Sequence, residues 1–278
     1  MTHEFEQVLN RNISGREKFL EDLKNLYPSE DVHGLNHALE VERKTIEVLG
    51  IACREAKARG KKMKVNLKVL SSAALWHDAG YTAEGKVISS DKFEHQSEGV
   101  KIVKKILQKN PFLSQREKAG ILMLIMVHDD TAFLYPIKTR EGKVCLTPDQ
   151  IKQRKRAVER LGFLTELKIL READSYFATG ERGLERTIEF SSRKGLPFFA
   201  DSDDPLRAEM WEISIVANLR LSARRAFEDA FTQRGKMLAA VGWLVQEREI
   251  FKRCQKEGID YYPDPSLIGN LLNWHENT

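Results

Sequence analysis

The feature that most limits what this chain can fold into is the helical spacing of its apolar residues. A capping box formed by Ser14 and Glu17 opens one apolar-faced segment, and Pro28 closes it. The same spacing predicts further helices over about residues 35–60, 65–78, 91–110 and 114–128, and from residue 147 onward. The chain is therefore expected to be all-α, as a helical bundle with a helical C-terminal extension.

Two segments of this pattern stand out. Residues 65–78 are apolar on nearly every side, which predicts a helix in the centre of the domain. Residues 128–147 carry proline and glycine and no helical period, so a loop or short hairpin is expected there, covering the functional site.

The sequence pattern changes in the C-terminal third of the chain. Residues 180–205 look less regular, and helical periodicity returns from about 208 to 256. We therefore expect an N-terminal helix over residues 1–30, a central domain over 31–180, and a helical extension over 181–278 that packs on the central domain.

Composition excludes several partners. The 45 basic and 41 acidic side chains leave a formal charge of only +4, without the basic cluster of a nucleic-acid binder. The three cysteines form no CxxC pattern, which indicates reduced thiols and a cytoplasmic protein. No secretory signal and no apolar run of membrane-spanning length is visible, so no membrane partner is expected. The sequence leaves the oligomeric state open.

Several ionisable residues occupy apolar stripes of these predicted helices. Histidine and aspartate recur at core-facing positions, at helical distances from Val, Leu and Ile: His37, His77, Asp78, His95, His128 and Asp174. Burying an unpaired charge costs several kcal/mol, and no Lys or Arg lies on those stripes. The nitrogen and oxygen donors suit Fe, Mn, Ni or Zn better than Ca or Mg.

In this order the six residues resemble the H…HD…H…H…D signature of the HD superfamily in its two-metal form, over about residues 31–178. The resemblance implies an HD-domain helical bundle and two divalent transition-metal ions. It also implies that Asp78 bridges the two ions and that the other five residues are divided between them.

The resemblance further implies a reaction. Residues 33–41 are similar to the first metal motif of the cyclic-nucleotide phosphodiesterase branch, in which the earlier histidine, here His33, is a general acid. We therefore expect a metal-dependent phosphohydrolase or phosphodiesterase that uses hydroxide formed between two metals. Its substrate would be a phosphorylated small molecule or nucleotide, held by Lys92, Lys138 and Arg171.

Alternatives remain open. The same ligand set occurs in mixed-valence diiron oxygenases of this superfamily and would also suit a non-catalytic metal-binding regulatory module. A single core histidine is usually only hydrogen-bonded, and the segment His128-Asp129-Asp130 offers a second HD dipeptide. The first dipeptide is preferred because it leaves one histidine before it and two after it, ahead of Asp174. No branch-specific motif follows the pair, so the substrate is not defined.

Overall fold

The computed structural model describes residues 16–27, 34–83, 86–87, 94–129, 148–193, 195–199 and 214–261. These residues fall into two compact units, the first ending at Asp174 and the second beginning at Ser175. The division into residues 1–30, 31–180 and 181–278, with the extension packed on the central domain, stays a prediction.

The first unit is helical, as predicted. Its helices are α2 (Arg16–Leu26), α3 (Leu35–Ala58), α4 (Leu67–Trp76), α5 (Glu94–Gln108), α6 (Gln115–Val127), α7 (Pro148–Leu161) and α8 (Leu164–Ser175). Between α4 and α5, the two-residue strands β1 (Thr82–Ala83) and β2 (Lys86–Val87) pair antiparallel. The hairpin is too small to change the class, and the all-α prediction is confirmed.

Local sequence explains where these helices begin and end. The capping box of α6 is present, with Ser114 and Glu117 each accepting the other's backbone N–H. Pro148 is the first residue of α7, as expected from its missing N–H. Gly60, with φ of 66°, follows α3, and Gly162, with φ of 80°, separates α7 from α8.

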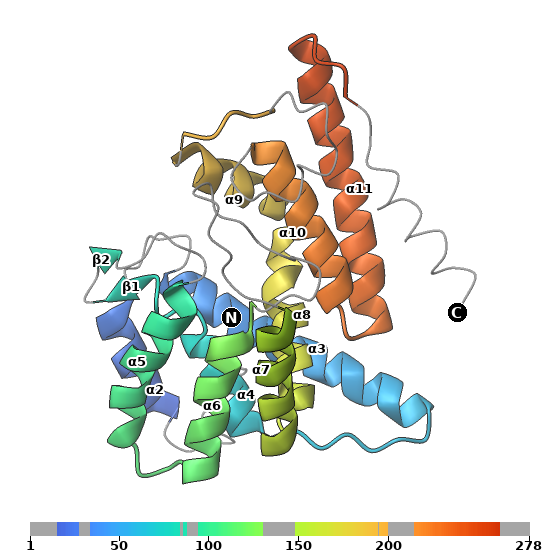
Figure 1. Cartoon of the computed structure of the whole chain (residues 1–278). Coiled ribbons are helices and arrows are strands. Elements are labelled where there is room, and N and C mark those ends of the chain that lie inside the picture. The colour runs from blue at the N-terminus through green and yellow to red at the C-terminus, as the bar shows by residue number, and fades with distance from the viewer. Residues whose placement is uncertain are drawn as a thin grey trace. The chain divides into compact units, whose positions relative to one another are not determined.

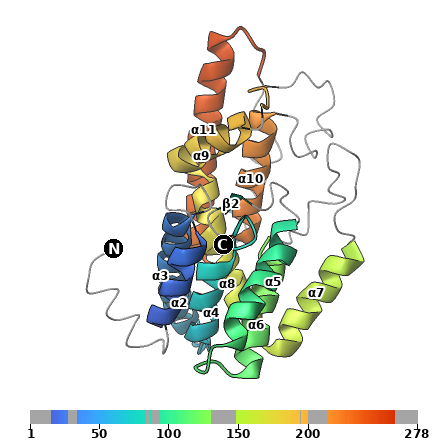
Figure 2. The same cartoon turned by 90° about the vertical axis from the view of Figure 1, so that its left-hand side faces the viewer.

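Helix α4 is the core of the first unit. Every residue from Val69 to Trp76 is buried, and the helix packs against α2, α3 and α6. Figure 2 shows α4 between the blue helices α2 and α3 and the green helices α5 and α6. The prediction of a central helix over residues 65–78 is thus confirmed, and the residues that follow α4 are held deep in the unit.

A buried ion pair joins the helices on one side of α4. The Arg16 guanidinium donates from Nε to Glu42 Oε1 at 2.9 Å, and both side chains are fully buried. The hydroxyl of Ser71 donates to the same carboxylate. Residues of α2, α3 and α4 therefore satisfy one another's polar groups inside the bundle.

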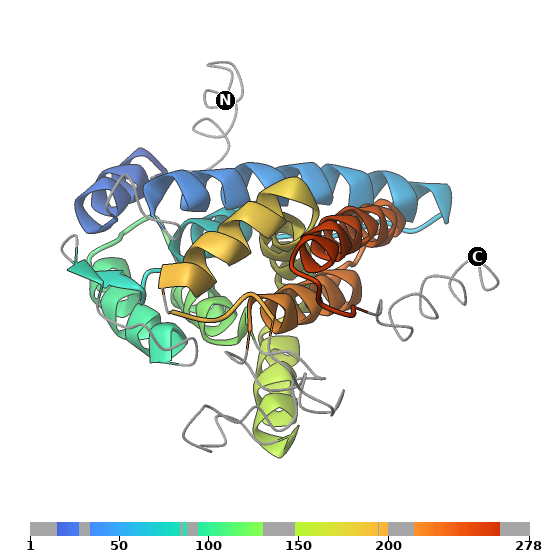
Figure 3. The same cartoon turned by 90° about the horizontal axis from the view of Figure 1, so that it is seen from above.

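The second unit contains η1 (Tyr176–Ala178), α9 (Gly180–Arg193), α10 (Ile215–Asp229) and α11 (Gln233–Lys256). Figures 1 and 3 show α10 and α11 side by side. Their own apolar core includes Leu184, Leu219, Trp243 and Ile250. This unit therefore has a hydrophobic core of its own.

One expectation for this part of the chain is wrong. Residues 180–193, expected to be irregular, form α9, because Leu184 and Ile188 lie one turn apart and pack on the core of the second unit. The helical periodicity expected from about 208 to 256 is confirmed where the structure describes it, as α10 and α11. The two helices are separated at Ala230, where the backbone becomes extended and Thr232 caps α11 by accepting from the Gly235 N–H.

Two further findings concern the thiols and the membrane. Cys53 is an exposed free thiol and Cys254 a buried one. Among the residues that the structure describes, no helix combines the length and apolarity needed to cross a membrane.

Candidate metal centre

The structure brings together all six residues singled out in the sequence. His37 lies in the first turn of α3, His77 and Asp78 directly follow α4, and His95 is the second residue of α5. His128 follows α6, and Asp174 lies at the end of α8. These four histidines and Asp78 are buried. The loop expected to cover the site lies outside the described residues.

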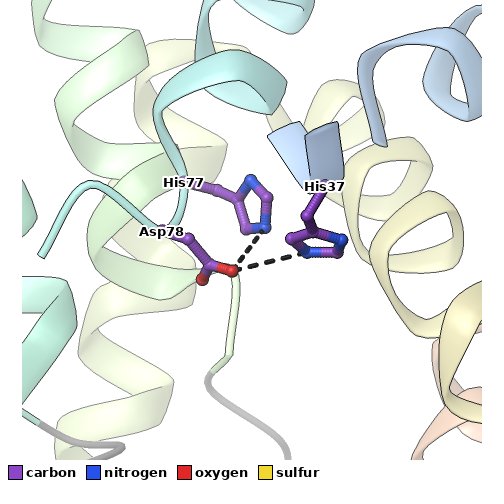
Figure 4. A group of neighbouring side chains, drawn as sticks. All are labelled: His37, His77 and Asp78. Atoms are coloured by element: carbon purple, nitrogen blue, oxygen red, sulfur yellow. Dashed lines mark ion pairs between the residues drawn. The ribbon is translucent and has the colours of Figure 1, made fainter. Parts of the chain in front are cut away.

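The first group of donors surrounds one oxygen of Asp78. His77 Nε2 lies 3.2 Å from Asp78 Oδ2 and 3.5 Å from Asp174 Oδ1. His37 Nε2 lies 3.4 Å and 3.6 Å from the same two oxygens. Figure 4 shows both imidazoles directed at the Asp78 carboxylate. Two nitrogens and two carboxylate oxygens thus converge here.

The second group surrounds the other oxygen of the same carboxylate. Asp78 Oδ1 lies 3.8 Å from His95 Nε2 and 3.7 Å from His128 Nε2. The two imidazole nitrogens are 3.4 Å apart. Each Asp78 oxygen therefore faces its own pair of histidines, as expected of a carboxylate that bridges two cations.

The tautomer of His77 tests whether a metal ion fits. Its Nδ1 lies 2.8 Å from the Ala74 carbonyl oxygen, which can only accept, so Nδ1 carries the hydrogen. In a neutral ring Nε2 then presents a lone pair to two carboxylate oxygens and makes no hydrogen bond within the described residues. Acceptors that converge on one another need a cation between them.

The pKa of His77 supports the same conclusion. Burial alone would lower the pKa of this imidazole, but the negative charges of Asp78 and Asp174 outweigh burial and raise the pKa well above its usual value. A positive charge at this position is therefore favoured. A divalent ion would supply that charge and balance both carboxylates, so the residues fit a metal ion.

His95 is positioned by two neighbours that the sequence reasoning did not single out as part of the site. The ring of Tyr81 stacks on its imidazole, with centroids 4.2 Å apart and planes 10° apart. Gly80 lies against the backbone of His95 and Gly99. Nothing in the sequence pattern marks either contact, because both depend on how α5 packs after the hairpin.

Two further residues near the site were not predicted as members. Asp129 Oδ2 lies 3.7 Å from His95 Nε2, and its signal in the sequence was the second HD dipeptide. Tyr27 is buried and its hydroxyl has no hydrogen-bond partner among the described residues. Burial and, secondarily, the charge of Asp78 raise the pKa of Tyr27 well above its ordinary value, so its phenol stays neutral.

The expected general acid and substrate contacts are only partly described. His33, Lys92 and Lys138 lie outside the described residues. Arg171 lies on α8, one turn before Asp174, and is partly buried. The roles proposed for these four residues stay predictions.

A search of solved structures found several similar chains. The chain is similar to a Lactobacillus plantarum protein of known crystal structure, at 15% identity and a TM-score of 0.57, over 89% of this chain and 99% of the other. It is also similar to an HD-superfamily hydrolase from Bacillus thuringiensis (14%, TM-score 0.47, covering 92% and 99%). A third similar structure is YpgQ from Bacillus subtilis (16%, TM-score 0.43, covering 81% and 99%).

No protein-family model and no curated protein sequence matches the chain. At 15% identity, the likeness to the Lactobacillus plantarum protein concerns the fold alone. The ligand groups are a separate observation, since His37, His77 and Asp78 form one candidate metal-binding group and Asp78, His95 and His128 form another. The helical bundle and these groups are consistent with an HD metal site, as the sequence resemblance implied.

Proposed function

We propose that this protein is a metal-dependent phosphohydrolase that binds two divalent transition-metal ions. One observation carries the proposal: the two oxygens of Asp78 face separate histidine pairs at 3.2–3.8 Å. His37, His77 and Asp174 would hold one ion with Asp78, and His95 and His128 would hold the other. The mixed nitrogen and oxygen donors suit Fe, Mn, Ni or Zn.

When bound, such ions polarise a phosphoryl oxygen and lower the pKa of water. The chain's own residues would set the position of the ions. The carbonyls of Ala74 and Ile125, each 2.8 Å from an imidazole Nδ1, hold the Nε2 atoms of His77 and His128 toward Asp78. His33 is proposed to protonate the leaving oxygen.

The charge of the proposed centre supports an anionic substrate. Two divalent ions exceed the charge of Asp78 and Asp174, so the centre would be net positive and would attract a phosphate group. A phosphorylated small molecule or a nucleotide meets this requirement. Lys92, Lys138 and Arg171 are proposed to contact its phosphate.

The test is a hydrolysis assay without oxygen. Protein loaded with Zn²⁺ or Mn²⁺ is given a panel of phosphomonoesters, phosphodiesters and nucleotides in water labelled with oxygen-18, under anaerobic conditions. We expect one labelled oxygen in the phosphate product of each cleavage. Asp78→Asn should lower turnover by about 100-fold or more, because it weakens both metal positions. Asp149→Asn, on the exposed start of α7, is the matched control.

Two outcomes would contradict the proposal. Turnover that requires both iron and O₂, with no label in phosphate, would identify an oxygenase. Metal binding without turnover of any phosphoester would leave a metal-binding regulatory module as the better description.

A further inference from the structure

The chain contains two His-Asp dipeptides in the same structural position. His77 is the C-cap residue of α4 and His128 that of α6. Both have helical backbone angles, with φ and ψ of −57° and −39° for His77 and −59° and −32° for His128. Asp78 and Asp129 follow directly. The two helices pack against each other, so the dipeptides occupy neighbouring helix ends.

The two histidines also make the same contact. Each Nδ1 lies 2.8 Å from the carbonyl oxygen three residues earlier, that of Ala74 or of Ile125. This contact directs each Nε2 into the site, at 3.2 Å and 3.7 Å from oxygens of Asp78. A carboxylate directly after such a histidine therefore lies next to the same cluster, as Asp78 demonstrates.

Asp129 occupies that place in the second group. Its Oδ2 lies 3.7 Å from His95 Nε2, as near as Asp78 Oδ1 at 3.8 Å, and its side chain is only 9% exposed. Ligand atoms of His128, Asp129 and Asp174 lie within 4.8 Å of one another. Asp129 thus faces both histidines of the second group.

We propose that Asp129 is a metal ligand that completes the second position. This inference rests on the proposed two-metal function. Without Asp129, the second group has two histidines and only the shared carboxylate, whereas the first group has Asp174 in addition. With Asp129, the second ion would be held by two imidazoles, one oxygen of Asp78 and a further carboxylate, as Asp174 would provide for the first ion.

A purely structural role for Asp129 makes a different prediction. A carboxylate that only accepts hydrogen bonds could be replaced by asparagine with changed stability but unchanged metal binding. A ligand, in contrast, contributes charge directly to its own ion, so its loss weakens one metal position more than the other.

The experiment measures Mn²⁺ binding to the full-length protein by equilibrium dialysis and electron paramagnetic resonance. Wild type should bind two ions and show the signal of a spin-coupled pair. Asp129→Asn should bind the first ion with near-wild-type affinity and the second at least about tenfold more weakly, with the signal of an isolated ion. Asp149→Asn should behave like wild type.

Each other outcome overturns a defined part of the account. If wild type binds two ions and both Asp129→Asn and Asp129→Ala bind them equally well, Asp129 is not a ligand and the proposed function stands. If wild type binds fewer than two ions, the binuclear centre and the role of Asp129 both fail. Asp129→Ala is the second variant if Asn proves able to bind Mn²⁺ through its amide oxygen, and circular dichroism checks that each variant is folded.

Discussion

Gly80 follows the His77-Asp78-Ala79 segment. Because glycine has no side chain, the backbone of α5 can lie directly against it. A Cβ built on Gly80 would overlap the carbonyl group of His95 and lie 2.7 Å from the Gly99 nitrogen. Real Cβ atoms do not tolerate such contacts, and the obstacles are backbone atoms that cannot rotate away. An added methyl group must therefore displace the start of α5.

We predict that Gly80→Ala selectively damages the second metal position, because His95 moves with α5. Stability should fall by about 1–3 kcal/mol, the usual cost of overpacking. Gly50→Ala is the matched control, since the nearest atom to its Cβ is the flexible Arg54 side chain at 3.6 Å. That change should leave metal binding intact and stabilise helix α3 by about 0.5–1 kcal/mol. Metal titration measures the effect. Wild-type affinities at both metal positions in Gly80→Ala would contradict this role of the glycine.

The helices that carry the ligands are joined at their other ends by a polar junction around Asn66. Its backbone N–H donates to Glu166 Oε1 at 2.7 Å, and its Nδ2 donates to Glu117 Oε1 at 3.1 Å. These three residues belong to the starts of α4, α6 and α8. The junction therefore fixes the relative position of the helices that end at Asp78, His128 and Asp174.

The two carboxylates of this junction should affect stability with opposite dependence on pH. Burial raises the pKa of Glu166 above its ordinary value of 4.5. The folded state then binds this proton more tightly than the unfolded state, so the contribution of Glu166 to stability is present below pH 4.5 and is lost as pH rises through the raised pKa. Glu166→Gln should remove this decrease of stability with rising pH. Glu166→Ala should lower the free energy of unfolding by about 1–3 kcal/mol, because the Asn66 N–H loses its acceptor.

Glu117 provides the control of opposite sign. Burial opposes its ionisation, but hydrogen bonds from Ser114 and Asn66 outweigh burial and lower the pKa of Glu117 below 4.5. Its stabilisation is present above pH 4.5 and is lost as pH falls through the lowered pKa. Urea unfolding of metal-free wild type, Glu166→Gln and Glu117→Gln across this range measures both effects. If both variants change the pH dependence of the unfolding free energy in the same direction, the junction does not control the ionisation of Glu166 and Glu117 as described.

The pair Arg16–Glu42 is the second polar element that organises the first unit. Both side chains are fully buried, so removing one partner leaves an uncompensated charge. We predict that Arg16→Met lowers the free energy of unfolding by about 3–5 kcal/mol and that adding Glu42→Leu recovers most of the loss. A double-mutant cycle by urea unfolding measures the coupling, and additive losses would show that the pair is not coupled.

At the scale of the whole molecule, the first unit was largely predictable from sequence because its signals are local. Capping residues such as Ser114 and Pro148, and the all-round apolarity of α4, depend only on neighbours in the chain. The six ligand candidates could be selected for the same reason, since ionisable residues in apolar stripes are conspicuous. Their convergence in space depends on packing between helices, which local sequence does not reveal. It was expected only because of the resemblance to the HD superfamily.

Long-range packing explains what was missed. Glycines at 180 and 183 weakened the helical signal of α9, which forms because its apolar side packs on the core of the second unit. The contacts of Tyr81 and Gly80 with α5 have no periodic signature. Asp129 was visible as part of a second HD dipeptide, but only the geometry shows that it lies 3.7 Å from His95 Nε2.

The central claim, that Asp78 joins two metal positions, is tested most directly by the ratio of metal to protein. Wild type and Asp78→Ala are stripped of metal, loaded with Zn²⁺ or Mn²⁺, freed of excess ion and analysed for metal content, with Asp149→Ala as the exposed control. The account predicts two ions per chain in wild type and in the control, and loss of both ions in Asp78→Ala, because its two oxygens serve both histidine pairs. A wild-type protein that retains no metal, or an Asp78→Ala variant that retains two ions, would contradict it.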